Sequence, residues 1–393
     1  MNGKVGMAHR ATVLVDATSL SRQMKGVGRY TWQICDALSR GLPAEADLML
    51  AVFDAALPDF PPDFRGRLIR LPYRSELRLG LVEFPRLIRQ TRAKVFIRPA
   101  DKIGCHYQVP TLTVCHDVNP LIWAAQPSRP WRRKMIEPVW EIFRGRALRA
   151  SDRVICNSQF IRVAAARHFG LAAGRTSVGY CGVDRRIPEL AKATHPADFR
   201  QQMGIGHFLL VFATGDEREG SNMLPELWQA TRAAGYPGQL VIAGIKEGAA
   251  YAEALRKAFQ PAGGAGTVIY RPFLGEEKLA ELAGLYRAAD FYLETSRHEG
   301  FGMQLVEAMA CGTTCFSSGR GALTEVGGGF PLPLDIENPA AAGQAVGAAW
   351  REGLHMRDNT DQVTHALTFN WVDTGRQVVQ FAREHLGVHS QLP

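Results

Sequence analysis

Two glutamates flank a glycine-rich turn in the stretch HEGFGMQLVEAMACG (298–312). Glu299 stands just before the Gly-Phe-Gly turn, and Glu307 lies inside the apolar run that follows it. Glycines let backbone N–H groups approach a ligand, and a helix that starts at Met303 would offer its N-terminus to phosphate oxygens. Acids on both sides could bind the hydroxyls of one long ligand with charge in its middle. This layout favours a sugar nucleotide over the alternative, two solvated glutamates near a helix N-terminus.

A second pair of glycines, Gly26 and Gly28, follows the first predicted strand and opens a helix. Glycines there would let the backbone approach a phosphate, and the helix N-terminus adds free N–H groups and a positive dipole end. A turn that binds no ligand is the alternative. The third glycine of the dinucleotide fingerprint is missing, so the motif disfavours NAD.

His116 and Asp117 follow the predicted strand 111–115. A histidine at the carboxyl end of such a strand can hydrogen-bond a polar substrate. Two alternatives stay open: a buried structural histidine bonded to its neighbouring aspartate, and a metal-binding His-Asp pair. The sequence has no further cluster of His or Cys ligands and no D-x-D motif, so we expect no metal.

The elements that must position these residues are short apolar runs that alternate with longer amphipathic segments. Strands are predicted over 11–15, 48–53, 94–97, 111–115 and 153–157, and then over 208–213, 239–244, 267–270, 290–294 and 313–317. Helices are predicted over 28–40, 130–148, 224–234, 276–288 and 303–310. Repetition on both sides of a break near 184–206 indicates two parallel α/β domains, whose ligand should lie in the cleft at the carboxyl ends of the strands.

Composition narrows the class of protein. The chain has 393 residues, enough for two domains, and 46% of them are apolar. No apolar stretch is long enough to span a bilayer, and the N-terminus lacks the apolar core of a signal peptide, so we expect a cytoplasmic protein. The seven scattered cysteines are expected to be reduced core thiols. Residues 1–190 carry 30 Lys+Arg and 16 Asp+Glu, whereas the remainder carries 16 and 22, which suggests domains with different partners.

Taken together, these motifs resemble the retaining glycosyltransferases of family four, which have the GT-B fold. The likeness rests on the E-x7-E segment and on further motifs in the same order: GVGRY (26–30), HDVNPLIW (116–123), ASDRVICNSQFIRVAAARHFG (150–170), CGVD (181–184), LVIAGIKEG (240–248), LGEEKLAELAGLYRAADFYLETS (274–296) and FNWVDTGRQVVQFA (369–382). The resemblance implies two Rossmann-like domains facing across a cleft. An acceptor-binding domain would cover 1–190, a donor-binding domain 191–368, and a C-terminal helix within 369–393 would return toward the first domain.

The resemblance also implies roles for individual residues. His116 and Glu299 would be catalytic, both hydrogen-bonding the transferred sugar, and Glu307 would bind the ribose. The donor-binding set would be Gly26, Gly28, Arg218, Lys246, Gly300, Phe301, Gly302 and Glu307. Enzymes of this family keep the anomeric configuration without an obvious enzyme nucleophile, and the leaving phosphate takes the acceptor proton. Neither a metal nor a cofactor is implied, because helix dipoles and basic side chains steady the departing diphosphate.

The loop TGDEREGSNM (214–223) departs from the family pattern, because Glu219 stands where a lysine is expected. An acid facing a phosphate would repel it. We therefore expect either that Arg218 turns toward the donor while Glu219 faces solvent, or that Lys246 supplies the cation. Gln304 also replaces the family's proline after the glycine turn.

The resemblance implies transfer of a hexose, such as mannose, from a UDP- or GDP-linked donor to a polysaccharide or a polyprenyl-linked saccharide, with no nucleic-acid partner. A catalytically inactive GT-B module that binds a sugar nucleotide or a partner enzyme is the alternative. The segment 65–102 is rich in arginine, and part of it (78–94) could form an amphipathic helix with Pro85 in its first turn. Peripheral contact with an anionic membrane and a solvated helix with its apolar face in the core are both open there.

Overall fold

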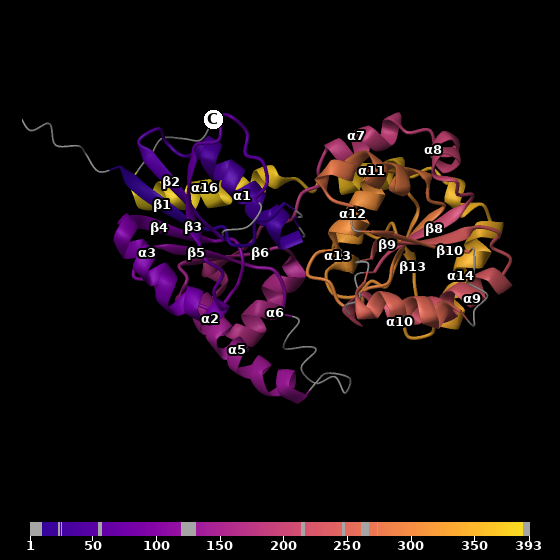
Figure 1. Cartoon of the computed structure of the whole chain (residues 1–393), viewed down its shortest axis with the longest axis horizontal. Helices are drawn as coiled ribbons and strands as arrows, with labels where there is room; N and C mark the ends of the chain where they lie inside the picture. Colours follow the sequence, from indigo (N-terminus) through magenta and orange to yellow (C-terminus); the bar gives the residue numbers. More distant parts are fainter. Residues whose placement is uncertain are drawn as a thin grey trace, which may run out of the picture. The chain divides into compact units, whose positions relative to one another are not determined.

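The structure is a computed structural model that describes residues 10–22, 24, 26–53, 57–118, 131–213, 217–245, 248–260, 267–272 and 274–387, with only the main chain given for 131–138, 217 and 276. The chain divides into two compact units (Figure 1). One contains the residues up to Cys181 together with those from Trp371 onward, and the other contains Gly182–Asn370.

The first unit is built on a seven-stranded, all-parallel sheet in the order β3-β2-β1-β4-β5-β6-β7. Its central strands are apolar and buried on both faces, as in β1, where Val13, Leu14 and Val15 have no exposed surface. The strands are β1 Ala11–Asp16, β2 Ala46–Phe53, β3 Gly66–Leu71, β4 Ala93–Arg98, β5 Thr111–Cys115, β6 Arg153–Cys156 and β7 Thr176–Val178.

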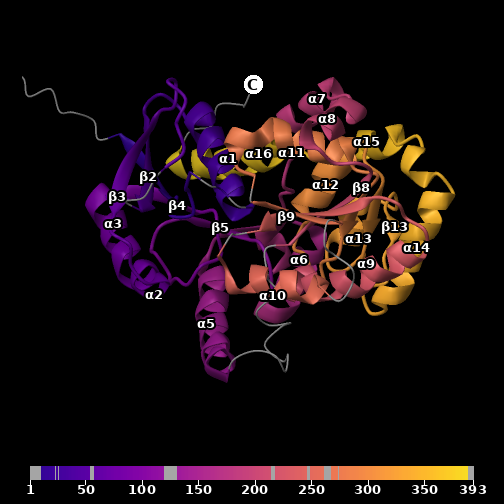
Figure 2. The same ribbon diagram turned by 45° about the vertical axis from the view of Figure 1, so that its right-hand side comes forward.

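Helices cover this sheet, and one of them comes from the far end of the chain. They are α1 Gly26–Gly41, α2 Glu76–Arg78, the π-helix η1 Leu79–Glu83, α3 Phe84–Thr91, α5 Trp131–Ala150, α6 Gln159–Phe169, the 3-10 turn η2 Ala173–Arg175 and α16 Trp371–Leu386. α16, yellow in Figures 1 and 2, packs on α1 and β4 among elements drawn in indigo. Thr374 Oγ1 donates to the Tyr180 carbonyl at 2.8 Å, and Gln377 Nε2 donates to the Val178 carbonyl at 2.9 Å. These hydrogen bonds hold α16 beside β7.

The second unit has a six-stranded parallel sheet in the order β10-β9-β8-β11-β12-β13. The strands are β8 Phe208–Phe212, β9 Gln239–Ile245, β10 Val268–Pro272, β11 Phe291–Glu294, β12 Cys315–Ser317 and β13 Leu332–Pro333. Its helices and turns are α7 Arg186–Ala193, α8 Pro196–Met203, η3 Glu217–Glu219, η4 Ser221–Met223, α9 Leu224–Ala233, α10 Ala250–Phe259, η5 Glu276–Lys278, α11 Leu279–Ala288, α12 Met303–Ala310, α13 Leu323–Gly327, α14 Pro339–Arg351, η6 Leu354–Met356 and α15 Thr360–Ala366.

All ten predicted strands and all five predicted helices are present, with ends that shift by a few residues. Three strands escaped prediction. β3 carries charged, exposed arginines because it lies at the sheet edge, and β7 and β13 have only three and two residues. The segment 184–206, expected as the break, instead forms the helices α7 and α8, which pack on α11 of the second unit.

The helix predicted in the arginine-rich segment is present as α3, with Pro85 in its first turn. Phe84, Leu87 and Ile88 form its apolar face, and all three are buried in the core of the first unit. The solvated-helix alternative is therefore correct for α3, and its apolar face cannot lie in a lipid surface.

Both sheets have a topological switch point, the place where successive strands leave in opposite directions across the sheet. In the first sheet it lies between β1 and β4, and in the second it lies between β8 and β11. Doubly wound sheets bind ligands at the carboxyl ends of the strands at such points. The loops after these four strands are therefore the parts of the fold to examine for a site.

Candidate functional site

Three loops meet at the carboxyl ends of β8, β11 and β12 in the second unit. The Arg297 amide donates to the Arg218 carbonyl at 2.5 Å, and Thr295 Oγ1 donates to the Glu219 carbonyl at 2.5 Å. On the other side, Ser318 Oγ donates to the Ser296 carbonyl at 2.6 Å. The loop after β11, which carries Glu299, is thus held between its two neighbours.

Glu299 lies in the middle of this junction and is partly buried. Its main chain forms a parallel bridge with Gly321, and its carbonyl accepts from the Ala322 amide at 2.9 Å. A β-carbon at Gly321 would lie 2.4 Å from that carbonyl oxygen, so the close approach requires glycine. The backbone of Glu299 is therefore fixed by the loop after β12.

Burial raises the pKa of the Glu299 carboxyl from 4.5 to about 8. The negative charge of Glu294 adds to this increase, whereas the positive charge of Arg218 opposes it. Glu294, at the end of β11, is itself buried, which raises its pKa, and it accepts from the Ser296 amide at 3.1 Å and from Tyr292 Oη at 3.0 Å. A protonated carboxyl at neutral pH can both donate to and accept from a hydroxyl group.

Arg218 and Glu219 lie side by side in η3, and each acts on the charge of Glu299. Both side chains are partly buried, and Glu219 raises the pKa of Glu299 where Arg218 lowers it. The Glu219 side chain is therefore neither fully exposed nor remote from Glu299, and the expectation that it faces solvent stays a prediction. Lys246, the other predicted cation, lies outside the described residues.

The glycine turn opens α12 as predicted. Gly302 caps this helix with φ +94°, a left-handed conformation that suits glycine, and a β-carbon there would lie 2.5 Å from Leu323 Cδ2. Gly300 and Phe301 are buried, and the Phe301 ring meets the Phe369 ring edge-on at 5.4 Å between centroids. The turn is thus a packed structure that presents its backbone, and Phe301 acts through packing.

Glu307 lies in α12 and is buried, with 3% of its surface exposed. Tyr286 Oη donates to Glu307 Oε2 at 3.1 Å. The carboxylate is therefore held by a tyrosine of α11, and its role in binding the ribose stays a prediction.

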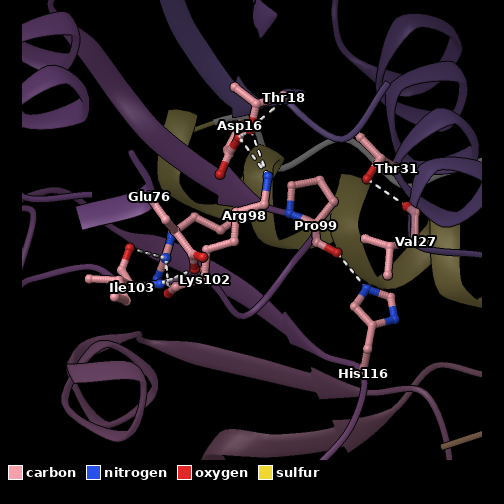
Figure 3. A network of polar contacts seen from close by, with 10 residues as sticks. All are labelled: Asp16, Thr18, Val27, Thr31, Glu76, Arg98, Pro99, Lys102, Ile103 and His116. Carbon is pink, nitrogen blue, oxygen red and sulfur yellow. Dashed lines mark hydrogen bonds and ion pairs between the residues drawn. The ribbon is translucent and has the colours of Figure 1, made fainter. Parts of the chain in front are cut away.

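In the first unit, His116 follows β5 and is 9% exposed. Its Nε2 lies 2.6 Å from the Pro99 carbonyl (Figure 3). Its ring meets the Tyr30 ring edge-on at 4.8 Å between centroids. The predicted alternative of a bond to the neighbouring Asp117 does not hold for Nε2. The Asp117 carboxylate instead lies 3.9 Å from Arg144 Nη2. Arg144 also forms ion pairs with Asp101 and Glu141, each at 3.0 Å.

Gly26 and Gly28 begin α1. Gly28 is buried, and a β-carbon there would lie 2.9 Å from the Ser19 carbonyl oxygen in the loop after β1. The second glycine therefore serves close packing of this loop against the helix. Gly26 is exposed.

Sequence reasoning missed a polar network at the switch point of the first sheet. It joins Asp16, the last residue of β1, and Thr18 to Arg98, the last residue of β4, and Lys102 (Figure 3). The signal was present in the sequence, since Asp16 directly follows the predicted strand 11–15 and Arg98 directly follows the predicted strand 94–97, and both side chains are buried. Buried charges at the carboxyl ends of adjacent strands are unusual enough to mark a site.

A cavity of about 400 Å³ lies beside the loop after β12, lined by Ser318, Arg320, Leu323, Thr324, Asp335 and other residues of the β12–β13 edge. It contains none of the predicted site residues.

Among the described residues, no group of three or more His, Cys, Asp or Glu side chains could hold a metal ion. Nor does any helix in that part of the chain have the length and apolarity to cross a membrane. All seven cysteines are free and six are buried, as predicted.

Family models match most of the chain. Residues 24–186 match Glycosyltransferase Family 4, and residues 207–350 match Glycosyl transferases group 1. The chain belongs to glycosyltransferase family four. The resemblance stated from the motifs is thereby confirmed.

Two curated relatives of this family-four chain are D-inositol 3-phosphate glycosyltransferases. The protein of Acidothermus cellulolyticus is 32% identical over 152 residues, which cover 38% of this chain and 33% of the relative. That of Corynebacterium glutamicum is 33% identical over 109 residues, covering 27% and 26%. The chain thus spans about a third or less of the length of these relatives.

Solved structures share the fold over nearly the whole chain. Sucrose-phosphate synthase of Thermosynechococcus elongatus has a TM-score of 0.72 at 20% identity and covers 96% of this chain and 99% of its own. WaaG, a glycosyltransferase of lipopolysaccharide biosynthesis, has a TM-score of 0.71 at 14% identity and covers 94% and 99%. Anabaena HepE in complex with UDP and glucose has a TM-score of 0.67 at 16% identity and covers 95% and 99%. These matches confirm the predicted GT-B fold class.

Proposed function

We propose that this family-four glycosyltransferase moves a hexose, such as mannose, from a UDP- or GDP-linked donor to a saccharide or polyprenyl-linked acceptor, with retention of configuration and without a metal ion. One observation carries the proposal. Arg218 and Glu299 come together at the switch point of the second sheet, where a cation and a hydroxyl-binding acid are both needed.

Each group at this junction suits one part of a nucleotide-sugar. The glycine turn and the N-terminus of α12 offer backbone N–H groups to the diphosphate, and Arg218 adds a positive charge. Glu299, protonated near neutral pH, donates to one sugar hydroxyl and accepts from another. Glu307 lies inside the helix that the diphosphate would face, where release of its oxygen from Tyr286 would let it bind the ribose.

The transfer then requires no nucleophile from the protein. The bond between the anomeric carbon and the diphosphate oxygen breaks, and the acceptor oxygen bonds to the same face of that carbon. The acceptor proton passes to the departing phosphate oxygen, which gives a glycoside and a nucleoside diphosphate. Negative charge grows on the leaving group, so Arg218 and the N–H groups stabilise the transition state more than the bound donor.

The test is turnover of a panel of UDP- and GDP-hexoses, measured as release of nucleoside diphosphate with and without added saccharides. We expect release from at least one donor, and Glu299→Ala should abolish it while binding of the free nucleoside diphosphate persists. Chelator should leave the rate unchanged. A Glu299→Ala variant with wild-type turnover would exclude the proposed role of this acid.

The second candidate, an inactive module that binds a sugar nucleotide, is favoured by one observation. Glu219 lies close enough to Glu299 to raise its pKa, so a negative charge stands near the place proposed for the diphosphate. Binding of nucleoside diphosphate without release from any donor in the panel would support this candidate.

Peripheral contact with an anionic membrane is proposed through a different surface from that first expected. The apolar face of α3 is buried, but Tyr73, Leu77 and Val82 are 80%, 46% and 53% exposed. Exposed arginines Arg74, Arg86 and Arg89 accompany them. Apolar side chains among cations suit an anionic lipid surface, where each nearby basic residue contributes about 1 kcal/mol.

A further inference from the structure

We infer that Lys102 is an acceptor-binding residue that donates to a hydroxyl group of an uncharged saccharide, at the switch point of the first sheet. The inference rests on the proposed glycosyl transfer and names a specificity-determining residue for it. Neither the family match nor the motifs assign a role to Lys102.

The Lys102 ammonium is held in place by groups from β1. Its Nζ donates to Thr18 Oγ1 at 2.6 Å and lies 3.8 Å from Asp16 Oδ1 (Figure 3). Thr18 Oγ1 donates in turn to Asp16 Oδ1 at 2.5 Å, and the Thr18 amide lies 3.2 Å from the same oxygen. Asp16 therefore orients Thr18, and Thr18 orients the lysine.

The main chain beside Lys102 is fixed from two further directions. Arg98 Nη2 donates to the Lys102 carbonyl at 2.5 Å and to the Ile103 carbonyl at 3.1 Å. Glu76 Oε1 accepts from the Ile103 amide at 2.8 Å. Arg98 is only 1% exposed, so a costly buried guanidinium is used to hold this one loop. Such rigid support is what a binding residue requires.

Lys102 is accessible where its partners are not. Its side chain is 25% exposed, whereas that of Asp16 is 1% exposed. An ammonium has three donors, and Thr18 is the one hydrogen-bond acceptor that the described residues supply to it. A ligand at the carboxyl ends of β1 and β4 would meet this ammonium.

One carboxylate oxygen of Asp16 indicates that the network has a role beyond folding. Its Oδ2 atom is buried and has no hydrogen-bond partner in the described part of the chain. A buried polar atom without a partner is costly, so its presence points to a function for this carboxylate. That function is to hold Lys102 and to balance its charge.

The charges at this edge indicate what kind of group binds. The network of Figure 3 holds two acids, Asp16 and Glu76, and two bases, Arg98 and Lys102, so it is balanced without a ligand. The neighbouring cluster holds Asp101, Asp117 and Glu141 around the single Arg144. Together these two networks of described residues hold five acids and three bases, which disfavours an anion beside Lys102, although the first 190 residues are basic as a whole. A neutral hydroxyl accepts from the ammonium without this penalty.

The experiment measures direct binding of saccharides by saturation-transfer NMR, so that it does not depend on turnover. The probes are methyl hexosides, the matching hexuronates and the hexose 6-phosphates. We expect the wild-type protein to bind a methyl hexoside in preference to its charged counterparts. Lys102→Met should weaken that binding about tenfold or more, and Lys102→Arg should weaken it less.

One control variant and one variant of the network separate binding from folding. Lys94→Met changes an exposed lysine at the other end of β4 and should leave saccharide binding unchanged. Asp16→Asn keeps an acceptor for Thr18 but removes one negative charge, so it should shift the preference toward the hexuronate, which a merely structural role would not do. Nucleoside diphosphate binding, measured by calorimetry, should be unaffected in all four variants.

Three results would overturn the inference: equal saccharide binding by wild type and Lys102→Met, tighter binding of the charged saccharides by wild type, or binding of none of the probes. If the wild-type protein does not bind nucleoside diphosphate, that result would instead count against the proposed function. The two failures are therefore distinguishable.

Discussion

Gly220 lies so close to Thr295 that a β-carbon at position 220 would stand 2.3 Å from the Thr295 carbonyl oxygen. The contact joins the loop after β8 to the loop after β11 at the switch point of the second sheet. Arg218 and Glu219 are the residues immediately before Gly220, and Glu299 is four residues after Thr295. The glycine thus sets how near the cation and the acid can come to each other.

Gly220→Ala should therefore lower donor turnover. Gly220 has φ +68°, so alanine would be strained there by about 1–3 kcal/mol, and its methyl group would push Arg218 away from Glu299. We expect turnover to fall about tenfold or more. The matched control is Gly204→Ala, since Gly204 has φ +64° but no atom within 4 Å of the place where the alanine methyl group would lie. Equal loss of turnover in both variants, at equal stability by urea unfolding, would show that the contact with Thr295 is unimportant.

The stability of the protein should depend on pH through Glu299. Its pKa is raised from 4.5 to about 8 by burial, so between these values the folded state binds a proton that the unfolded state has lost. Stability is then lost as the pH rises from about 5 toward 8. Glu299→Gln should flatten this dependence, although Glu294, whose pKa burial also raises, will leave part of the slope.

Urea unfolding at several pH values between about 5 and 8.5 measures this effect, with Glu352→Gln as the exposed control. The control should keep the wild-type slope. An unchanged slope in Glu299→Gln would mean that the Glu299 carboxyl titrates near its ordinary value in the folded protein.

The membrane proposal predicts salt-sensitive sedimentation with vesicles of phosphatidylglycerol. Replacing the exposed Tyr73 and Val82 by serine should reduce the bound fraction at low salt, because these side chains would enter the lipid surface. Val163→Ser is the control, since Val163 is 59% exposed on α6, away from this segment. Wild-type protein that does not sediment at low salt would remove the membrane proposal.

Much of the fold could be predicted because its signals are local. Buried parallel strands are apolar throughout, and the ten that were predicted include β1 and β11, which lie inside their sheets. β3 was not predicted because an edge strand needs only one buried face, and its arginines hide the pattern. The glycine turn before α12 was also predictable, because its signal is local: the glycines come directly before the apolar run that forms the helix.

The environment of each site residue could not be predicted, because it depends on groups far away in the sequence. Glu299 was recognised, but its raised pKa depends on burial and on Glu294 and Arg218, which come from different parts of the chain. Glu307 was also recognised, but no local signal indicated that a tyrosine of α11 holds it. Lys102 was considered only as one basic residue of the segment 65–102, because only the pairing of β1 with β4 brings it to Asp16 and Thr18.

Arg218 and Glu219 make the sharpest prediction, because adjacent residues of opposite charge act on the same carboxyl. If Arg218 stabilises the departing diphosphate, Arg218→Ala should lower kcat about 100-fold and weaken donor binding much less. Arg218→Lys should recover part of the loss, and Lys246→Ala should cost less than Arg218→Ala. Glu219→Gln removes a charge that repels phosphate, so it should tighten donor binding and raise kcat.

Steady-state kinetics and calorimetry with the free nucleoside diphosphate separate these effects. A larger loss in Lys246→Ala than in Arg218→Ala would transfer the role to Lys246. A lower kcat in Glu219→Gln would show that Glu219 assists the transfer and does not merely repel the diphosphate. Donor binding that responds to none of these variants, in a protein that never releases nucleoside diphosphate, would favour the inactive module, because a diphosphate that departs at this switch point must respond to the charges of Arg218 and Glu219.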